Sequence, residues 1–400
     1  MSNTSTSSVR AKNKLVPKLR FPKFVNDSEW ENEKVENLIS TIIPPKKLTS
    51  SNYLQNGKYH IIDQSQNYYC GWTNDEEAII SNGFPLIIFG DHTCILKLVG
   101  EPFAQGADGI KILKSNDSIE PEFLFQYLLS NPVKQEEYKR HFSILKEKVV
   151  AYPNIKTGEQ QKIADCLSSL DDLITAEKQK LEALKTHKKG LMQNLFPAEA
   201  ETVPRLRFKE FENSREWEEK RLDEICVVNP SSDNLPEQFI YIDLESVEDG
   251  VLLQKKHMSL ADAPSRAQRL LNSGDVIFQM VRPYQKNNFI FYPDDDLNYV
   301  ASTGYAQLRA YESEMYLYQY LHNQNFVKKV LAKCTGSNYP AINSNQLSEI
   351  LIVIPKPDEQ QKIADCLSSS DGLIISQSQK IETLKEHKKG LMKGLFPNFE

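Results

Sequence analysis

The chain lacks the sequence features that are typical of metal, disulfide-bonded and membrane proteins. Its six cysteines are scattered and form no CxxC pair. We therefore expect neither a zinc site nor a disulfide framework, and we expect the thiols to be reduced. No apolar run exceeds the length of a strand, and the first fourteen residues are polar and basic. No membrane span or export signal is therefore expected, and we predict a cytoplasmic protein.

Familiar catalytic motifs are also missing. The sequence has no GxxxxGK(S/T) phosphate loop, no GxGxxG, no HExxH and no GxSxG. The pair Pro44 and Pro45 lacks the polar and aromatic neighbours of an amino-methyltransferase motif. A nuclease-like pattern around Glu386 is not kept in the first copy of the repeat described below, where Thr186 stands at that position. We therefore predict a chain that is non-catalytic on its own and that has no metal site or cofactor.

An excess of positive charge is absent too. Acidic side chains outnumber basic ones by 54 to 48, which gives a formal net charge of −6. Because general nucleic-acid binders are usually basic, any contact with DNA has to come from local groups of Lys and Arg. The length of 400 residues exceeds what a single core usually organises, so two or more domains are expected.

What the sequence does contain is a long internal repeat. The segment EQQKIADCLSSLDDLITAEKQKLEALKTHKKGLMQNLFP (159–197) returns as EQQKIADCLSSSDGLIISQSQKIETLKEHKKGLMKGLFP (359–397), with 28 of 39 positions identical. A shorter motif, followed in both cases by a tryptophan, reads PKLRFPKF at 17–24 and PRLRFKEF at 204–211. Repeats of this length indicate a duplicated domain.

The regions between the repeats are unlike each other and are expected to present different surfaces on a shared frame. Strands followed by a helix predict a mixed α+β fold for each, within a pseudo-two-fold duplication. The predicted strands are 84–92, 93–100 and 109–115 in the first region and 239–247, 274–281, 288–293 and 305–311 in the second, and the predicted helices are 121–130 and 314–331. The predicted segments are 1–26 (tail and short motif), 27–158 (first variable domain), 159–197 (first repeat helix), 198–216 (linker and short motif), 217–358 (second variable domain) and 359–397 (second repeat helix).

The long repeat is helical by pattern. Its apolar residues follow the 4,3 spacing of a coiled-coil seam about five heptads and roughly 50 Å long. Two such helices in one duplicated chain predict an antiparallel intramolecular coiled coil. Glu177 and Gln377, near the middle of each seam, either meet and fix the register or face solvent. The seam residues are Ile163, Leu167, Leu170, Ile174, Leu181, Leu184, Leu191 and Leu195, and Ile363, Leu367, Ile374, Ile381, Leu384, Leu391 and Leu395.

The order of these motifs resembles the DNA specificity subunit of type I restriction-modification systems. In both halves of the chain a PxLRFxxF motif is followed by a variable region and then by an EQQKIAD…HKKGLMxxLFP helix. The resemblance covers nearly the whole chain. It implies that each variable region is a target recognition domain for one half of a bipartite, asymmetric DNA site, and that the paired helices set the spacing and bind two methyltransferase subunits. It also implies that S-adenosylmethionine, ATP and Mg belong to partner subunits, which methylate adenine and, through attached restriction subunits, cut DNA.

Base-reading side chains are expected on exposed loops that carry Arg, Lys, Asn or Gln. Residues 255–286 are locally basic, the loop MVRPYQKNNF (280–289) adds an aromatic, and TGSNYPAIN (335–343) resembles a loop common in recognition domains. Ordinary surface loops are the alternative, and Tyr69 and Trp72 could be core residues. The predicted DNA contacts are Lys255, Lys256, Arg266, Arg269, Arg282, Tyr284, Gln285, Lys286, Asn287, Asn288, Ser337, Asn338 and Tyr339 in the second region, and Lys46, Lys47, Tyr68, Tyr69, Trp72, His92 and Lys97 in the first.

Basic HKKG groups and LFP endings lie at matched ends of the two repeat helices, an arrangement that would offer two equivalent docking sites. Packing within the chain is the alternative. Two other functions compete with DNA reading: an adaptor that binds two proteins without DNA, and an enzyme whose site is assembled across both variable regions. The predicted docking residues are His187, Lys188, Phe196, His387, Lys388 and Phe396.

Overall fold

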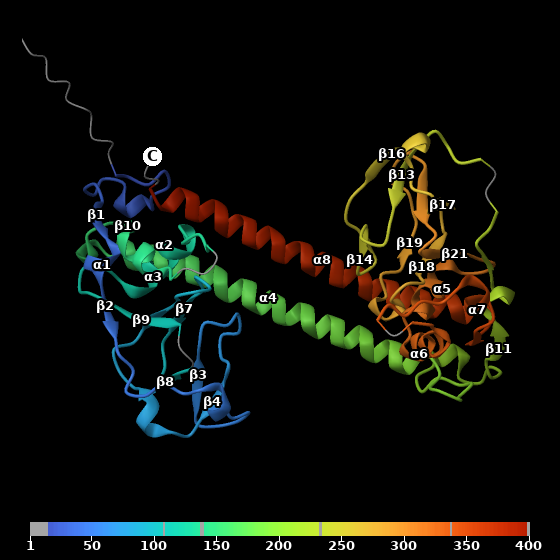
Figure 1. Cartoon of the computed structure of the whole chain (residues 1–400), viewed down its shortest axis with the longest axis horizontal. Coiled ribbons are helices and arrows are strands. Elements are labelled where there is room, and N and C mark those ends of the chain that lie inside the picture. The colour runs from blue at the N-terminus through green and yellow to red at the C-terminus, as the bar shows by residue number, and fades with distance from the viewer. Residues whose placement is uncertain (1–14, 107–108, 137–139, 232–233, 337, 398–400) are drawn as a thin grey trace, which may run out of the picture. The chain divides into compact units, whose positions relative to one another are not determined.

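The computed structural model describes residues 15–106, 109–136, 140–231, 234–336 and 338–397. The chain forms two compact units. Unit 1 comprises Met1–Lys178 with Gln379–Glu400, and unit 2 comprises Gln179–Ser378. Each unit therefore holds one variable region, part of the first long helix and part of the second (Figure 1).

The two repeats form long helices, α4 (Glu159–Leu195) and α8 (Pro357–Leu395). Gly158, in the left-handed conformation at φ 77°, precedes α4, and Pro357 is the first residue of α8, where a missing amide proton costs no helix hydrogen bond. The predicted seam residues are all buried or half-buried. No helix within the described residues combines the length and apolarity needed to cross a membrane.

The two long helices run antiparallel in each unit. In unit 1, Asp171 of α4 is ion-paired with Lys388 of α8, and Glu177, one turn and a half further along α4, is ion-paired with Lys380, which precedes Lys388. Partners that advance along one helix thus retreat along the other, as an antiparallel coiled coil requires. The predicted meeting of Glu177 with Gln377 stays a prediction.

Unit 1 is built from two four-stranded sheets and one two-stranded sheet. The sheet orders are β2-β9-β6-β7, β4-β3-β8-β5 and β1-β10, with β3 and β8 parallel and the other neighbours antiparallel. The elements are β1 (Glu31–Lys34), α1 (Val35–Leu38), β2 (Ile39–Ile42), β3 (Tyr59–Ile62), β4 (Gly71–Thr73), β5 (Ile79–Ile80), β6 (Leu86–Gly90), β7 (Leu96–Val99), β8 (Phe103–Gln105), β9 (Ile110–Ser115), α2 (Pro121–Ser130), α3 (Phe142–Glu147) and β10 (Val149–Tyr152).

Unit 2 repeats this topology. Its sheets are ordered β12-β21-β18-β19, β16-β13-β20-β17 and β11-β22, again with one parallel pair, β13 and β20; a short hairpin, β14-β15, is added. The elements are β11 (Glu218–Arg221), β12 (Cys226–Val228), β13 (Gln238–Ile242), β14 (Val247–Glu248), β15 (Val251–Leu252), β16 (Lys256–Ser259), β17 (Ala267–Leu270), β18 (Val276–Gln279), β19 (Phe289–Ile290), β20 (Tyr299–Ser302), β21 (Tyr305–Ala310), α5 (Glu314–Leu321), α6 (Gln324–Lys333), α7 (Ser344–Ser348) and β22 (Leu351–Ile354).

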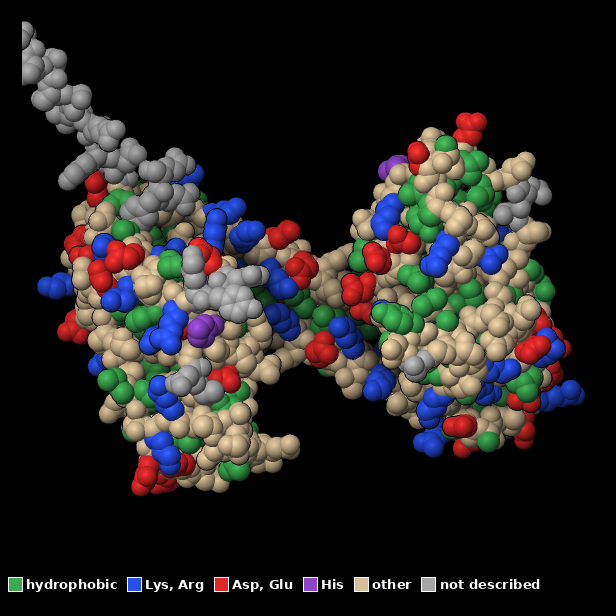
Figure 2. All heavy atoms as spheres, viewed as in Figure 1, with side chains coloured by type: hydrophobic (Ala, Val, Ile, Leu, Met, Phe, Trp, Pro, Cys, Tyr) green, Lys and Arg blue, Asp and Glu red, His purple; other side chains and the backbone are tan. Residues whose placement is uncertain are grey.

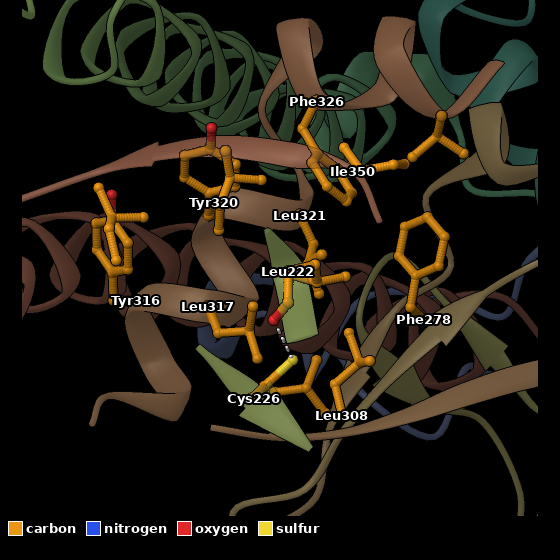
Figure 3. Packing of buried hydrophobic residues seen from close by; sticks show 14 of the residues in the cluster. Leu222, Cys226, Phe278, Leu308, Tyr316, Leu317, Tyr320, Leu321, Phe326 and Ile350 are labelled. Atoms are coloured by element: carbon orange, nitrogen blue, oxygen red, sulfur yellow. Dashed lines mark hydrogen bonds between the residues drawn. The ribbon is translucent and has the colours of Figure 1, made fainter. Parts of the chain in front are cut away.

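The main core of each unit lies where the variable domain meets the long helices. In unit 2, Tyr316, Leu317 and Tyr320 of α5 are buried with Phe278 of β18 and residues of α8 (Figure 3). The tryptophan that follows each short motif is buried in the core of its unit, Trp30 in unit 1 and Trp217 in unit 2. Burying this apolar surface stabilises the junction by about 25 cal/mol for each Å² removed from water.

The helix predicted at 314–331 is two helices in the structure. It breaks at His322 and Asn323, between α5 and α6. The Asn323 backbone is extended, at φ −62° and ψ 136°, and its side chain accepts a hydrogen bond from the Asn325 amide at 2.7 Å. Asn323 is therefore an N-cap, a role in which Asn competes well with the helix interior. The prediction of a single helix was wrong because apolar periodicity continues across this cap.

Candidate nucleic-acid interface

Two loops of unit 2 meet beside the β12-β21-β18-β19 sheet. One joins β18 to β19, and the other lies between α6 and α7. They are held together through the backbone, since the Arg282 amide donates to the Pro340 carbonyl at 2.7 Å. We call residues 280–288 and 334–343 the paired loops of unit 2. Ser337, a predicted DNA contact in the second loop, lies outside the described residues.

Arg282 is the most exceptional residue of the paired loops of unit 2. Its backbone is left-handed, at φ 54° and ψ 54°, a conformation that costs energy for a residue with a Cβ and is often found at functional sites. Its guanidinium carbon lies 4.3 Å from the centroid of the Tyr339 ring, which is 62% exposed. Tyr284 and Asn338 are exposed beside them. A planar, permanently charged donor group is thus held against an exposed aromatic ring.

Other residues of the first loop that were predicted to contact DNA form hydrogen bonds inside the loop and support it. Asn288 is buried, and its side-chain oxygen accepts a hydrogen bond from the Gln279 amide at 2.9 Å. The Gln279 side chain donates to Gln285 at 2.9 Å and accepts from the Asn287 amide at 3.1 Å. Asn288 therefore positions the loop in this structure instead of lying exposed to a base edge, and its buried side-chain nitrogen has no hydrogen-bond partner among the described residues.

Lysines of the predicted basic region are engaged inside unit 2. Lys255 forms ion pairs with Asp294 and Asp295 at 2.7 and 2.8 Å. Lys256 forms one with Asp243 at 2.6 Å. On the face shown in Figure 2, basic and acidic side chains are interspersed instead of forming one basic field. The sequence cluster is therefore not a continuous basic surface, because acids from distant segments neutralise it.

The remaining cations of that region differ in their surroundings. The Lys286 ammonium donates to the His322 carbonyl at 2.9 Å, and burial lowers its pKa, with the Lys189 charge acting in the same direction. Arg269, in β17, is half-buried, its Nε has no partner among the described residues, and burial lowers its pKa. Arg266 is exposed. Lys286 thus ties the first loop to the end of α5.

Unit 1 has a topologically equivalent pair of loops. Residues 91–95 join β6 to β7, as 280–288 join β18 to β19, and residues 131–141 precede α3, as the second loop of unit 2 precedes α7. These two segments are the paired loops of unit 1. The His141 amide donates to the Asp91 carbonyl at 2.9 Å, and the Asp91 carboxylate accepts from the amide of the next residue, the first of α3, at 2.8 Å.

The side chain of His141 joins the two loops of unit 1, and its hydrogen bonds define the tautomer of its ring. Its Nδ1 donates to the Asp91 carbonyl at 2.9 Å, because a carbonyl can only accept, and its Nε2 accepts from the Glu136 amide at 2.8 Å. His92, a predicted contact, is exposed on the first loop. Lys134 and Arg140 are exposed on the second and were not predicted. The KQEEYKRH run that contains them is a signal that sequence reasoning could have used.

Lys97 was predicted to contact DNA, and the structure contradicts this. It is 4% exposed, and its ammonium donates to the carbonyls of Asp63 at 2.8 Å and Asn67 at 2.6 Å. Burial lowers its pKa. Lys97 thus provides hydrogen bonds to backbone carbonyls of the loop that follows β3. In the same loop, the side chain of Tyr68 is exposed.

The other candidates of unit 1 lie near the β4-β3-β8-β5 sheet. Lys46 is exposed and ion-paired with Asp75 at 2.6 Å, and Lys47 is exposed. Trp72 is half-buried, with its ring 4.0 Å from that of His60. Tyr69 stacks on the same histidine at 3.7 Å. Trp72 and Tyr69 thus belong to an aromatic cluster that packs on this sheet.

The aromatic residues at the ends of the long helices pack inside the chain. Phe196 is 1% exposed, with its ring 5.4 Å from that of Tyr320. Phe396 is 2% exposed, with its ring 5.1 Å from that of Tyr127. Burial of both rings favours the alternative of packing within the chain for these two residues, and their docking to a partner stays a prediction.

The charged and histidine residues near these helix ends differ in exposure: the histidines are exposed, and the lysines form ion pairs within the chain. His187 and His387 are exposed. Lys188 is ion-paired with Asp371 at 2.5 Å in unit 2, and Lys388 is 9% exposed and ion-paired across the helices in unit 1. These lysines therefore form ion pairs within the chain, and their predicted contact with a partner stays a prediction.

A matched pair of ion pairs was missed by sequence reasoning. Arg20 donates to both carboxylate oxygens of Glu159 at 2.8 and 2.7 Å, and Arg207 donates to both of Glu359 at 2.8 Å. The arginine of each PxLRF motif thus binds the first residue of the EQQKIAD repeat in its own unit. Both motifs were visible in the sequence, but not that they pair.

The sequence profile described as the type I restriction modification DNA specificity domain matches this chain over residues 27–186 and 214–386. The HindI specificity subunit of Haemophilus influenzae is 24% identical over 192 residues, which are 46% of this chain and 42% of that protein. The MjaIX specificity subunit of Methanocaldococcus jannaschii is 26% identical over 272 residues, which are 63% of this chain and 61% of that protein. The chain thus matches less than two thirds of the length of these relatives.

Solved structures share the fold. The crystal structure of a type I restriction-modification S subunit from M. genitalium aligns with a TM-score of 0.62 over 96% of this chain and 100% of that chain, at 16% identity. A chain from a structural study of complex assembly in a type I restriction-modification system aligns with a TM-score of 0.52 over 92% of this chain and 98% of that one, at 15% identity.

Proposed function

The chain belongs to the family of type I restriction-modification DNA specificity domains, and on that premise we propose that it is the non-catalytic, sequence-reading subunit of such a complex. Each variable domain reads one half of a bipartite DNA site. The observation that carries this proposal is the presence of equivalent paired loops on matching sheets, furnished with unlike side chains. Equivalent position provides two readers, and unlike chemistry makes the two halves of the site different sequences.

Arg282 is the leading base-reading residue of the second half-site. A guanidinium can donate two hydrogen bonds to the O6 and N7 acceptors of guanine in the major groove. Stacking on Tyr339 at 4.3 Å holds the plane of that group before DNA arrives, so less side-chain freedom is lost on binding. Exposed Asn338 and Tyr284 lie in the same loops and supply further contacts to bases or phosphates.

Unit 1 is expected to read with different chemistry. Its paired loops expose His92, Lys134 and Arg140, and have no stacked arginine and tyrosine among their described residues. Cations at this position favour phosphates and guanine, while the histidine can donate or accept according to its tautomer. Two unlike half-sites follow, and the site as a whole is asymmetric.

The repeats are the proposed docking surface for two methyltransferase subunits. Equivalent positions on α4 and α8 expose apolar side chains, Leu173 at 41% and Leu373 at 58%, with His187 and His387 exposed further along each helix. Identical exposed patches in one chain suit two copies of one partner. Under this proposal S-adenosylmethionine, ATP and Mg belong to the partners, which methylate adenine and recruit restriction subunits.

Exchange of one variable domain tests the proposal. Residues 27–158 are replaced by the corresponding segment of a family member with a different half-site, and methylation by the complex with its methyltransferase subunits is mapped. We expect one half of the methylated sequence to change and the other to stay. If neither half changed, the chain would act as an adaptor; methyl transfer by the purified chain alone would instead support a composite enzyme.

A further inference from the structure

A three-residue polar group links the recognition domain of unit 1 to both long helices. Lys388 of α8 donates to both carboxylate oxygens of Asp171 of α4, at 2.6 and 2.7 Å. The same carboxylate accepts a hydrogen bond from the side-chain amide of Gln126 of α2 at 2.8 Å. We call these residues the unit 1 triad. It joins three elements that are distant in sequence and nearly encloses the amide, which is 1% exposed.

Unit 2 contains the same arrangement. Lys188 of α4 donates to Asp371 of α8 at 2.5 Å, and Asp371 accepts from the amide of Gln319 of α5 at 2.7 Å. The lysine and the aspartate occupy the same repeat positions as in unit 1, with their helices exchanged. These residues form the unit 2 triad. The glutamines lie outside the long repeat, but each stands in a short matching pattern, FLFQYL at 123–128 and YLYQYL at 316–321.

The amides are placed for specificity more than for stability. In both triads the glutamine oxygen is buried with no hydrogen-bond partner among the described residues. Such an atom costs free energy, and buried polar groups that are kept at this cost in coiled coils commonly fix register or orientation. Each lysine also occupies a seam position, where an apolar residue would stabilise the helix pair by burial alone.

The triads accept a single register. If α8 slipped by one heptad in one direction, Lys388 would face Ala164 and Lys188 would face Ala364. If it slipped in the other direction, Lys388 would face Lys178 and Lys188 would face Ser378. The first slip offers no carboxylate at either facing position; the second brings Glu177, the neighbour of Lys178, near Lys388 but leaves Lys188 opposite Ser378 with no carboxylate beside it. Each slip therefore removes at least one of the two ion pairs, while the apolar positions still follow the 4,3 spacing. The lysine and aspartate pairs therefore discriminate against registers that the apolar residues permit.

The glutamine extends this discrimination to the reading loops. Helix α2 packs on β6, which leads into the first of the paired loops of unit 1, and α5 packs on β18, which leads into that of unit 2. Register along the helix pair and the seating of each recognition domain thus depend on one carboxylate in each unit.

We propose that the two triads are positioning residues that determine which spacing between DNA half-sites the chain accepts. This rests on the proposed function, since it presumes a bipartite site. The residues touch no base in this account. They act by holding each recognition domain at a fixed place and angle on the helix pair, so that a half-site displaced by one base pair meets a misplaced loop.

The test replaces both ion pairs by apolar pairs. In the quadruple variant Asp171→Leu, Lys388→Leu, Lys188→Leu and Asp371→Leu, no buried charge is left unpaired, and such replacements are often neutral or stabilising. The variant complex with its methyltransferase subunits is offered DNA carrying the half-sites at the preferred spacing and at spacings one and two base pairs longer or shorter. We expect the preference for the correct spacing to fall about tenfold, equivalent to about 1.4 kcal/mol, with both half-site sequences unchanged.

A second variant, Gln126→Met with Gln319→Met, keeps the ion pairs and removes only the amides, so it serves if the quadruple variant does not fold. It is expected to relax the spacing in the same direction. The matched control, Glu182→Ala with Lys185→Ala, removes an exposed ion pair from α4 and should leave the spacing strict. Strict spacing in the folded quadruple or Gln→Met variant overturns the proposal. If the wild-type complex methylates no bipartite site, the proposed function fails instead, so the two failures are distinct.

Discussion

Arg282 combines three properties that seldom occur together in one surface residue: a left-handed backbone, a main-chain bond that ties two loops, and an aromatic ring beneath its guanidinium. The main-chain bond ties the two loops together, and Asn288 and Gln279 support the first loop from inside, but the stacked guanidinium itself has no such supporting role in the described contacts. At the scale of the residue, a strained backbone that holds a half-buried guanidinium against an exposed ring is best explained by recognition.

Replacing Arg282 should alter the reading of the second half-site only. Arg282→Ala is expected to weaken discrimination at one base pair of that half by about 1–3 kcal/mol, because the paired donors to guanine are lost. Arg282→Lys should restore the salt dependence of binding but not the base preference, since an ammonium lacks the planar fork. Competition binding with single-base variants of the site measures both. The control is Arg221→Ala, at an exposed arginine paired with Asp223, and an unchanged base preference in Arg282→Ala would remove this residue from the interface.

The buried arginine of each short motif should be a major determinant of stability. Arg207→Met leaves Glu359, whose side chain is 3% exposed, without its partner, and we expect unfolding of unit 2 to become easier by about 3–5 kcal/mol. Adding Glu359→Gln should recover part of the loss, because the unpaired charge is then gone. Chemical denaturation of the three proteins tests this, and a loss below about 0.5 kcal/mol in the single variant would contradict it.

His322 should make unit 2 sensitive to acid. Burial lowers its pKa to about 4, and the charges of Lys188 and Lys286 act in the same direction; its Nδ1 donates to the Tyr318 carbonyl at 2.8 Å. The unfolded chain, with a histidine pKa of about 6.5, therefore binds more protons between pH 6.5 and 4, so stability falls as the pH drops through that window. From pH 7 to pH 5 the loss due to this residue is about 2 kcal/mol.

Denaturant unfolding at pH 7 and pH 5 of the wild type and His322→Asn isolates this effect from the titration of carboxylates. Asn keeps a hydrogen-bond donor and does not titrate. The variant should lose about 2 kcal/mol less than the wild type between the two pH values. Equal losses would show that His322 is protonated in the folded protein as readily as in the unfolded one.

At the scale of elements, predictability followed the length of the apolar pattern. The long helices were visible because seam residues such as Ile163 and Leu167 recur over five heptads, and α2 was found at its observed bounds, Pro121–Ser130. The strands β4 and β8 were missed, since three residues carry too little pattern to distinguish a strand from a loop. Their pairing, with β8 parallel to β3, is decided by contacts between distant segments.

The break between α5 and α6 provides a test at this scale. Asn323→Ala removes the side chain that accepts from the Asn325 amide and should destabilise unit 2 by about 1 kcal/mol. Asn323→Asp, which keeps an equally good cap, is the matched control and should be nearly neutral. Thermal unfolding of both variants measures the difference. A stable Asn323→Ala would mean that packing alone ends α5.

The candidate site was harder to predict than the fold, for a physical reason. Lys97 and Arg282 are both cations that the sequence offered as DNA contacts, yet Lys97 is buried under backbone carbonyls while Arg282 stacks on the exposed ring of Tyr339. Lys188 and Lys388 were predicted as docking residues, but the aspartates that pair with them within the chain, Asp371 and Asp171, lie 183 and 217 residues away. Exposure and long-range pairing decide these roles, and neither is a property of local sequence.

At the scale of the whole molecule, one frame is used twice. The strand orders match between units, the Arg–Glu pairs and polar triads match, and the loops that differ are those at equivalent sheet positions. Under the proposed function, duplication would preserve what two identical partners and a fixed register require, and would leave the reading surfaces free to diverge. A chain built in this way is expected to recognise two unrelated short sequences held at one separation.

Mapping of methylated adenines in DNA exposed to the complex of this chain with its methyltransferase subunits tests that central claim most directly, because it returns both half-sites and their separation in one experiment. We predict a single split motif with two unrelated halves and one fixed number of unread base pairs between them. A continuous or palindromic motif, or two halves found at many different separations, would contradict the account.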